Sequence, residues 1–176
     1  MKRLFYICII AHSIFMLNAS AQDNDRLMRF KAVFIYNFID YVHWPETEFE
    51  EPFKIGLLGQ SPLEDPLREI AKKRSSEGRE MQVEMYDTIE NIKECHLIFI
   101  TQEHKENLDS LSAQLQGQNI LTISDTPGLA KQGVSINFVL VKGKLKFEIN
   151  RHALNKANLR ASAQLLKLAI LVDDLQ

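Results

Sequence analysis

The chain has 176 residues, of which 45% are hydrophobic and 25% are charged, and it contains 7 Gly and 5 Pro. This length and composition are typical of one globular domain and exclude a disordered, collagen-like or low-complexity protein. With 21 Lys and Arg against 23 Asp and Glu, the formal net charge is −2. Nucleic acid is therefore not expected as a partner, because a protein that binds it needs a broad basic surface.

The first 21 residues have the pattern of a cleavable signal peptide. Met1-Lys2-Arg3 is a positively charged start, residues 4–17 are mainly apolar, and Ala19-Ser20-Ala21 places small residues where a signal peptidase cuts. The apolar run is shorter than the about 20 residues of a membrane-spanning helix, so an uncleaved anchor is the less favoured alternative. We therefore expect a signal peptide at 1–21 and a periplasmic domain at 22–176 that is not inserted in the membrane after cleavage.

Cleavage would leave one cysteine. Cys8 lies in the signal peptide, and Cys95 opens the apolar run at 96–100. A single thiol cannot form an internal disulfide. We expect Cys95 to be buried at the start of a core strand, since free cysteine packs as a small apolar residue, and the alternative is a reactive or intermolecular thiol.

Residues 25–44 have the apolar spacing of three and four that is typical of an amphipathic helix. Asp23 or Asn24 is expected to cap its beginning, and Pro45 to end it, with His43 near the C-terminal end of the helix dipole. The helix has more apolar residues than one face requires. The excess residues, which we expect either to contact a partner or to be buried beneath the C-terminal helix, are Val33, Ile35, Tyr36 and Ile39.

The remaining chain alternates between strand and helix patterns. Short apolar runs predict six strands, at 53–59, 81–85, 97–101, 119–124, 135–141 and 144–149. Helices are predicted at 62–73, 103–116, 151–157 and 162–172. Because helices separate most of the strands, we expect an α/β fold in a single compact domain. Its sheet of about six strands would be largely parallel and flanked by helices, with a C-terminal antiparallel hairpin that turns at Lys142-Gly143.

Motifs for catalysis, metals or cofactors are missing from the sequence. The five histidines include no pair at a spacing that lets two imidazoles share a metal ion. The Gly56–Ser61 segment follows a strand and precedes a helix, but it lacks the glycine pattern of a dinucleotide site and the Gly-Lys-Ser/Thr ending of a phosphate loop. No nucleophile elbow is present. We therefore predict no enzyme, no cofactor and no metal site.

Three residues mark an alternative site for a small ligand. Gly59, Ser61 and Asp125 lie at or just after the ends of predicted strands, and α/β sheets place ligands at the carboxyl ends of their strands. Each residue also has a local structural explanation. Gly59 permits a turn, Ser61 caps the next helix, and Asp125 caps the turn at 126–128, which is the favoured interpretation.

Four segments in order resemble the YfiR/HmsC-like periplasmic proteins. They are Lys31–Phe38 followed by Val42–Pro45, then Cys95–Ile100, Leu121–Asp125, and Phe147–Asn150 leading to Leu165–Ala169. The likeness extends from about Phe30 to Val172 and implies a compact α/β domain of about six strands. It also implies a non-catalytic regulator that holds an inner-membrane diguanylate cyclase inactive by binding its periplasmic part, until an outer-membrane partner sequesters it. Some members of the family carry disulfides, which the single Cys95 does not allow within the domain.

Two functions follow as expectations. The first is an exported regulator that binds a membrane sensor, such as a diguanylate cyclase or a histidine kinase, or a second copy of itself in a homodimer, through exposed apolar surface. The second is a domain that binds a small ligand at the strand ends.

Overall fold

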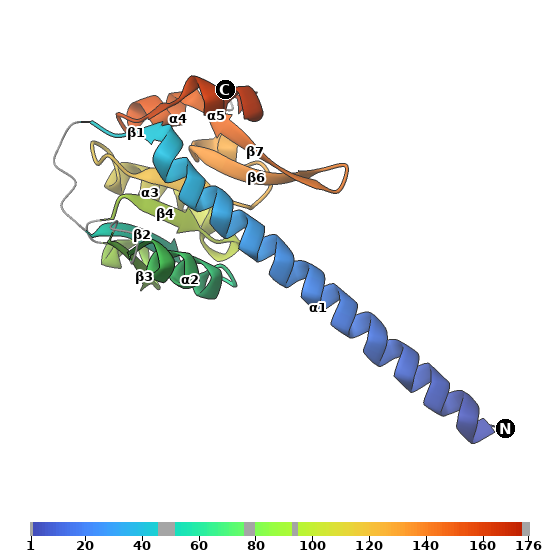
Figure 1. Cartoon of the computed structure of the whole chain (residues 1–176). Helices are drawn as coiled ribbons and strands as arrows, with labels where there is room; N and C mark the ends of the chain where they lie inside the picture. The colour runs from blue at the N-terminus through green and yellow to red at the C-terminus, as the bar shows by residue number, and fades with distance from the viewer. Residues whose placement is uncertain (1, 46–51, 76–79, 93–94, 174–176) are drawn as a thin grey trace.

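The computed structural model describes residues 2–45, 52–75, 80–92 and 95–173, with side chains from Gln22 onward. Its body is a seven-stranded sheet with helices on both faces (Figure 1). The strands of this sheet are β2 (Phe53–Leu58), β3 (Met81–Tyr86), β4 (Leu97–Ile100), β5 (Leu121–Ser124), β6 (Ile136–Val141), β7 (Lys144–Asn150) and β9 (Ile170–Val172). Two short strands, β1 (Val42–His43) and β8 (Arg160–Ala161), form a separate antiparallel pair.

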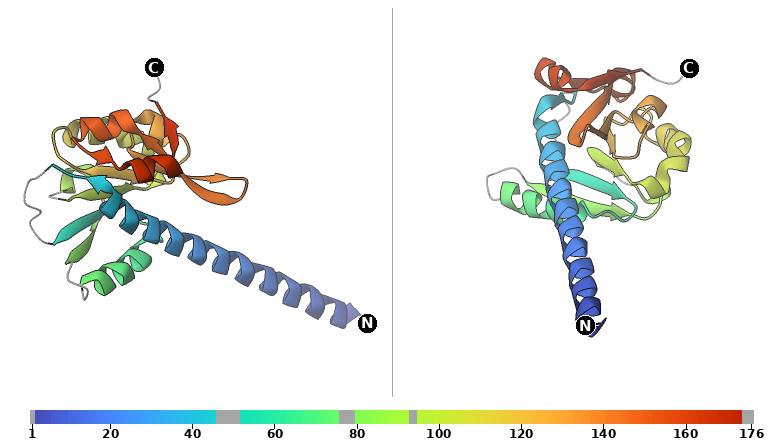
Figure 2. Two further views of the ribbon diagram at one scale, coloured as in Figure 1. Left: turned by 45° about the horizontal axis from the view of Figure 1, so that its top comes forward. Right: turned by 90° about the vertical axis from the view of Figure 1, so that its right-hand side faces the viewer.

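The helices connect these strands and cover the sheet. The α-helices are α1 (Lys2–Tyr41), α2 (Glu64–Ser75), α3 (Leu108–Gln114), α4 (Arg151–Lys156) and α5 (Ala163–Leu168). The 3-10 helices are η1 (Ile89–Asn91), η2 (Gln102–Asn107) and η3 (Leu129–Gln132). Figure 2 shows α1 crossing one face of the sheet and extending at its N-terminal half beyond the body of the domain.

The sheet is parallel except at its hairpin. Its order is β3-β2-β4-β5-β6-β7-β9, and β6 and β7 form the antiparallel pair. The central strands β2 and β4 are apolar along almost their whole length, because helices cover both faces of a parallel sheet. The predicted α/β class and largely parallel sheet are confirmed.

Two apolar clusters hold the layers together. Alternate residues of β4 point to opposite faces, so that Leu97 and Phe99 join one cluster while Ile98 and Ile100 join the other. The larger cluster lies between the sheet and α1, α2 and α5, and the smaller one lies beneath α3, η1 and η3. The predicted apolar face of residues 103–116 is confirmed by the burial of Leu108 and Leu111, although the segment begins as 3-10 helix.

Helix α1 differs from the prediction at both ends. It begins at Lys2, so that Asp23 and Asn24 lie within the helix and do not cap it. It ends at Tyr41, because the next two residues pair with β8, and Ser162 N donates to Tyr41 O (2.8 Å). His43 therefore lies in strand β1 and not at the helix end.

The C-terminal segment contains a strand that the apolar pattern does not predict. Ser162 Oγ accepts from Leu165 N (3.2 Å) at the start of α5, which ends at Leu168. Residues 170–172 then form β9, which pairs in parallel with β7. The expectation of one helix at 162–172 was wrong, because the run Ile-Leu-Val adds to the open edge of β7. The hairpin is consequently internal to the sheet, and β9 is its edge.

Candidate functional site

Helix α1 has one buried face and one exposed face, and the predicted partner residues divide between them. Ile35, Tyr36 and Ile39 are buried in the larger cluster, with exposed fractions of 0%, 9% and 7%. They do not form a free surface, so for these three residues burial, and not partner contact, is the alternative that the structure shows. Tyr36 is further covered by the Arg74 guanidinium, which lies 4.3 Å from the ring centroid. Val33 is 48% exposed and is the only one of the four that lies on the surface.

The exposed face of α1 carries an apolar stripe of which the sequence analysis singled out only Val33 as a partner residue. Phe30, Val33 and Tyr41 are 56%, 48% and 41% exposed. The exposed Asn37 lies between Val33 and Tyr41, so that the four residues are three or four positions apart. This spacing places them on one side of the helix. Large apolar side chains grouped on a surface are typical of a binding site for another protein. We call Phe30, Val33 and Tyr41 the α1 stripe.

Aromatic packing fixes α1 on the sheet. Phe34 and Phe38 contact Phe138 and Phe147, with ring centroids separated by 5.0–6.2 Å. Just beyond α1, Trp44 Nε1 donates to Asn119 O (2.9 Å). These contacts hold the stripe in one orientation relative to the domain.

A buried ion pair adds a polar contact between α1 and the sheet. Lys31 Nζ lies 2.5 Å from Asp125 Oδ2, and the Lys31 residue is only 6% exposed. Asp125 follows β5 on the face that α1 covers, since Ile123 of the same face belongs to the larger cluster. The turn after β5 is capped instead by Ser124 Oγ, which accepts from Thr126 N (3.2 Å). The favoured interpretation of Asp125 as a turn cap is therefore corrected.

None of the three residues predicted for a ligand cleft lines the pocket that the structure describes. Gly59 and Asp125 directly follow β2 and β5, and β4 lies between these strands. The position of Gly59 is filled, because an added Cβ would lie 2.3 Å from Thr101 Oγ1. Ser61 Oγ accepts from Leu63 N (3.2 Å) before α2 begins, as the helix-cap interpretation predicts. Each residue thus has a structural role.

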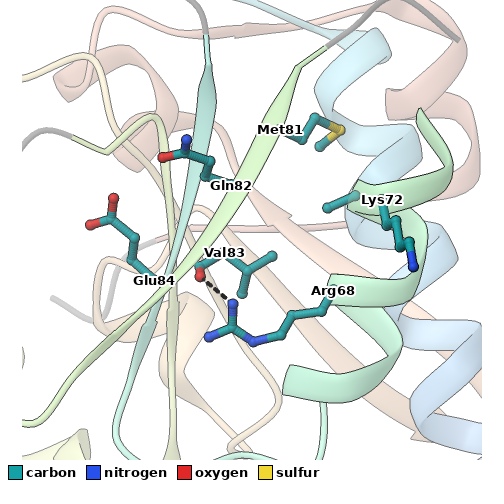
Figure 3. Close-up of a pocket in the computed structure, with 7 residues that line it drawn as sticks. Arg68, Lys72, Met81, Gln82, Val83 and Glu84 are labelled. Carbon is teal, nitrogen blue, oxygen red and sulfur yellow. Dashed lines mark hydrogen bonds between the residues drawn. The ribbon is translucent and has the colours of Figure 1, made fainter. Parts of the chain in front are cut away.

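A described pocket lies elsewhere, between α2 and the edge strand β3 (Figure 3). Its volume is about 420 Å³, and it is lined by Arg68, Ala71, Lys72, Met81, Gln82, Val83 and Glu84. Arg68 Nη1 donates to Val83 O (2.8 Å), a carbonyl group on the outer side of the edge strand. This bond occupies an acceptor that another extended chain would otherwise use, which protects the edge from unwanted pairing.

Two titratable groups are perturbed by burial. Burial raises the pKa of the Cys95 thiol to about 12, and the thiol is free and buried as predicted. Burial, and then the charge of Lys54, lower the pKa of His96, whose Nδ1 accepts from Lys54 N (3.0 Å). Both groups lie at the amino ends of the strands, and their environments favour the neutral forms.

The described ranges of the chain contain neither a metal-binding cluster nor a membrane-spanning helix. Within these ranges, acidic, histidine and cysteine side chains form no group of three that could hold a metal ion. Over the same part of the chain, none of the helices combines the length and the apolarity that crossing a bilayer requires.

Comparisons with known proteins give a fold relative and a family. No curated protein matches the chain. Among solved structures, the chain is similar to an ABC domain from Streptococcus pneumonia in complex with L-Trp, with a TM-score of 0.51 and 12% sequence identity. The match covers 68% of this chain and 55% of that one, so the chain spans little more than half of that domain, and the likeness concerns the fold alone. The YfiR/HmsC-like family model matches residues 28–170, and the chain therefore belongs to the YfiR/HmsC-like family.

Proposed function

We propose that the protein is an exported, non-catalytic regulator that binds the periplasmic part of a membrane signalling protein, with a diguanylate cyclase as the expected partner. The observation that carries this proposal is the family match over residues 28–170, because the family is known for periplasmic regulation of such a cyclase. The signal peptide at residues 1–21 and the periplasmic location belong to the same proposal.

The α1 stripe supports the proposal with a surface of suitable chemistry. Three large apolar side chains are exposed on a helix whose opposite face is fully packed. The regulator would act by population shift. If it binds the inactive state of the cyclase more tightly than the active state, the free energy of that difference moves the equilibrium toward the inactive state.

The test is a complementation experiment in cells that lack the protein. The wild-type gene is expected to lower cellular cyclic di-GMP, and a Phe30→Ser/Val33→Ser/Tyr41→Ser variant is expected to fail. Loss of the stripe should weaken binding to the cyclase's periplasmic part at least about tenfold, as removal of apolar anchors from an interface does. Leu168→Ser is the matched control, because Leu168 is 68% exposed and lies outside the stripe.

Three outcomes decide between partners. Full complementation by the stripe variant would refute the stripe as the contact surface. If deletion of the protein leaves the cyclic di-GMP level unchanged but alters the output of a histidine kinase, the kinase and not the cyclase would be the partner. A variant that loses only self-association would assign the stripe to a homodimer.

A second candidate function is the binding of a small polar molecule. The pocket between α2 and β3 favours it, since its volume of about 420 Å³ lies within the usual range for ligand sites and the charged residues Arg68, Lys72 and Glu84 line it. A thermal-shift screen with amino acids and carboxylic acids is the test. A ligand is expected to raise the melting temperature of the wild type but not of Arg68→Met, and a flat screen would exclude this function.

A further inference from the structure

The β6–β7 hairpin extends beyond the body of the domain (Figure 1). The two strands pair from Ile136↔Ile149 at the base to Val141↔Lys144 at the tip. Residues at the base are buried, whereas Leu140 and all residues from Val141 to Lys144 are exposed. The last rung of the ladder therefore stands clear of the core, and in the rung before it Leu140 is exposed while Leu145 packs against the larger cluster. We call residues 139–146 the hairpin tip.

The hairpin tip exposes apolar side chains on both faces. Leu140 is 63% exposed and pairs with the half-buried Leu145, which continues the apolar row that begins at Phe138 and Phe147. Val141 is 41% exposed and points to the opposite face, since neighbouring residues of a strand alternate. Exposed apolar residues at the end of a projecting hairpin do not contribute to the core.

The tip is also basic, in a chain whose net charge is negative. Lys142, Lys144 and Lys146 are all exposed, and no acidic residue occurs between Phe138 and Phe147. Lys142 has φ 51, a left-handed backbone conformation that favours Asn or Gly in a two-residue turn. The turn thus places a lysine at the extreme end of the hairpin where folding alone would favour another residue.

We infer that the hairpin tip docks on a membrane surface that contains anionic lipid. Leu140 and Val141 would enter the boundary between headgroups and acyl chains, and the lysines would contact lipid phosphates. An acidic protein partner fits less well, because a stable interface buries about 800 Å² on each side and needs a broader surface than a projecting hairpin end. Shallow lipid contact needs only a few apolar side chains beside basic ones.

This inference does not depend on the proposed function. The hairpin tip and the α1 stripe are different residues, so each can be removed without the other. Docking at a membrane would nevertheless hold the domain near the periplasmic part of a membrane protein. The effective concentration of the domain at that protein would rise, which favours binding between the two.

Vesicle co-sedimentation tests the inference with the exported protein, after its N-terminus has been determined by mass spectrometry. The wild type is expected to bind vesicles of phosphatidylcholine mixed with phosphatidylglycerol, to bind pure phosphatidylcholine weakly, and to lose binding as salt is raised. Lys142→Gln/Lys144→Gln is expected to lower the partition coefficient about 25-fold, at about fivefold for each lysine. Leu140→Ser/Val141→Ser should lower it at least about tenfold.

The control variant is Lys131→Gln/Lys156→Gln, which removes two exposed lysines that lie outside the hairpin tip, in η3 and α4 beside the hairpin base, and should bind like the wild type. All variants share one N-terminus, so any contribution of the residues before the domain cancels, and thermal unfolding confirms that each is folded. The inference is overturned if the wild type does not bind anionic vesicles or if the tip variants bind them as well as the control does. It is also overturned if the tip binds an acidic protein and not lipid.

Discussion

Breaking the buried ion pair between Lys31 and Asp125 should have unequal effects on stability, depending on which partner is removed. The pair joins α1 to the end of β5, and the two residues are 94 positions apart in the chain. The Lys31 side chain is 8% exposed, whereas that of Asp125 is 30% exposed. Removing Asp125 leaves an ammonium group that water barely reaches. Removing Lys31 leaves a carboxylate that water can partly solvate.

The expected free energies follow from this difference. Loss of one partner of a fully buried pair costs about 3–5 kcal/mol, and the partial exposure of Asp125 places Asp125→Asn near the lower end, at about 3 kcal/mol. Lys31→Met should cost about 1 kcal/mol, because methionine fills the same apolar path and the remaining carboxylate is hydrated. The double variant should also cost about 1 kcal/mol, which corresponds to a coupling energy of about 3 kcal/mol.

Urea unfolding followed by far-UV circular dichroism measures these values. The surface pair of Arg29 and Glu69 is the control, since its atoms lie 2.8 Å apart but its side chains are 64% and 67% exposed. Substitution of either residue there should cost less than about 0.5 kcal/mol. Equal losses for Lys31→Met and Asp125→Asn, or additive losses in the double variant, would refute the argument from burial.

Three further predictions concern other positions. Gly59→Ala should lower the free energy of unfolding by about 3 kcal/mol, because φ is +86 and the new Cβ would clash with side chains. Gly117→Ala, where φ is +77 but the space around the residue is open, should lower it by only about 1 kcal/mol. The free energy of unfolding should fall as the pH is lowered through about 6.5. Because the pKa of His96 is lowered in the folded protein, the unfolded chain binds the proton more readily. A His96→Gln variant whose stability kept the full dependence on pH would contradict this. Cys95, whose pKa is raised from 9.0 to about 12, should react with a thiol reagent about a thousandfold more slowly in the native protein than in urea, and equal rates would show that it is not buried.

The strands of the sheet could be predicted because each has a local signal. Runs such as residues 97–100 are apolar throughout and are bounded by polar residues, as strands covered on both faces are. The hairpin followed from Lys142-Gly143 between two alternating segments, and both residues do have positive φ. The short strands β1, β8 and β9 have two or three residues each and no periodicity, so only the tertiary structure reveals them.

The exposed and buried faces of α1 could not be assigned from the sequence. The helix has apolar residues on most of its circumference, and the pattern shows only that more than one face must be covered or must bind something. Ile35 and Val33 are both β-branched, yet one is fully buried and the other is 48% exposed. The difference depends on where the sheet and α2 lie against the helix. The contact between Lys31 and Asp125 is likewise invisible in a sequence without tertiary information.

The residues that carry the family resemblance explain the fold better than the binding function. Lys31 makes the buried ion pair, Phe34 and Phe38 pack on the hairpin base, and Trp44 bonds to the segment before β5. Such residues are constrained by packing, and a match to them therefore establishes the architecture. A partner can contact only the side chains that the fold leaves exposed. Val33 is the clearest case, because it lies among those motif residues and yet is exposed to solvent. Substitutions that separate regulation from folding should therefore be made at Val33 and its exposed neighbours, and not at the motif residues that surround it.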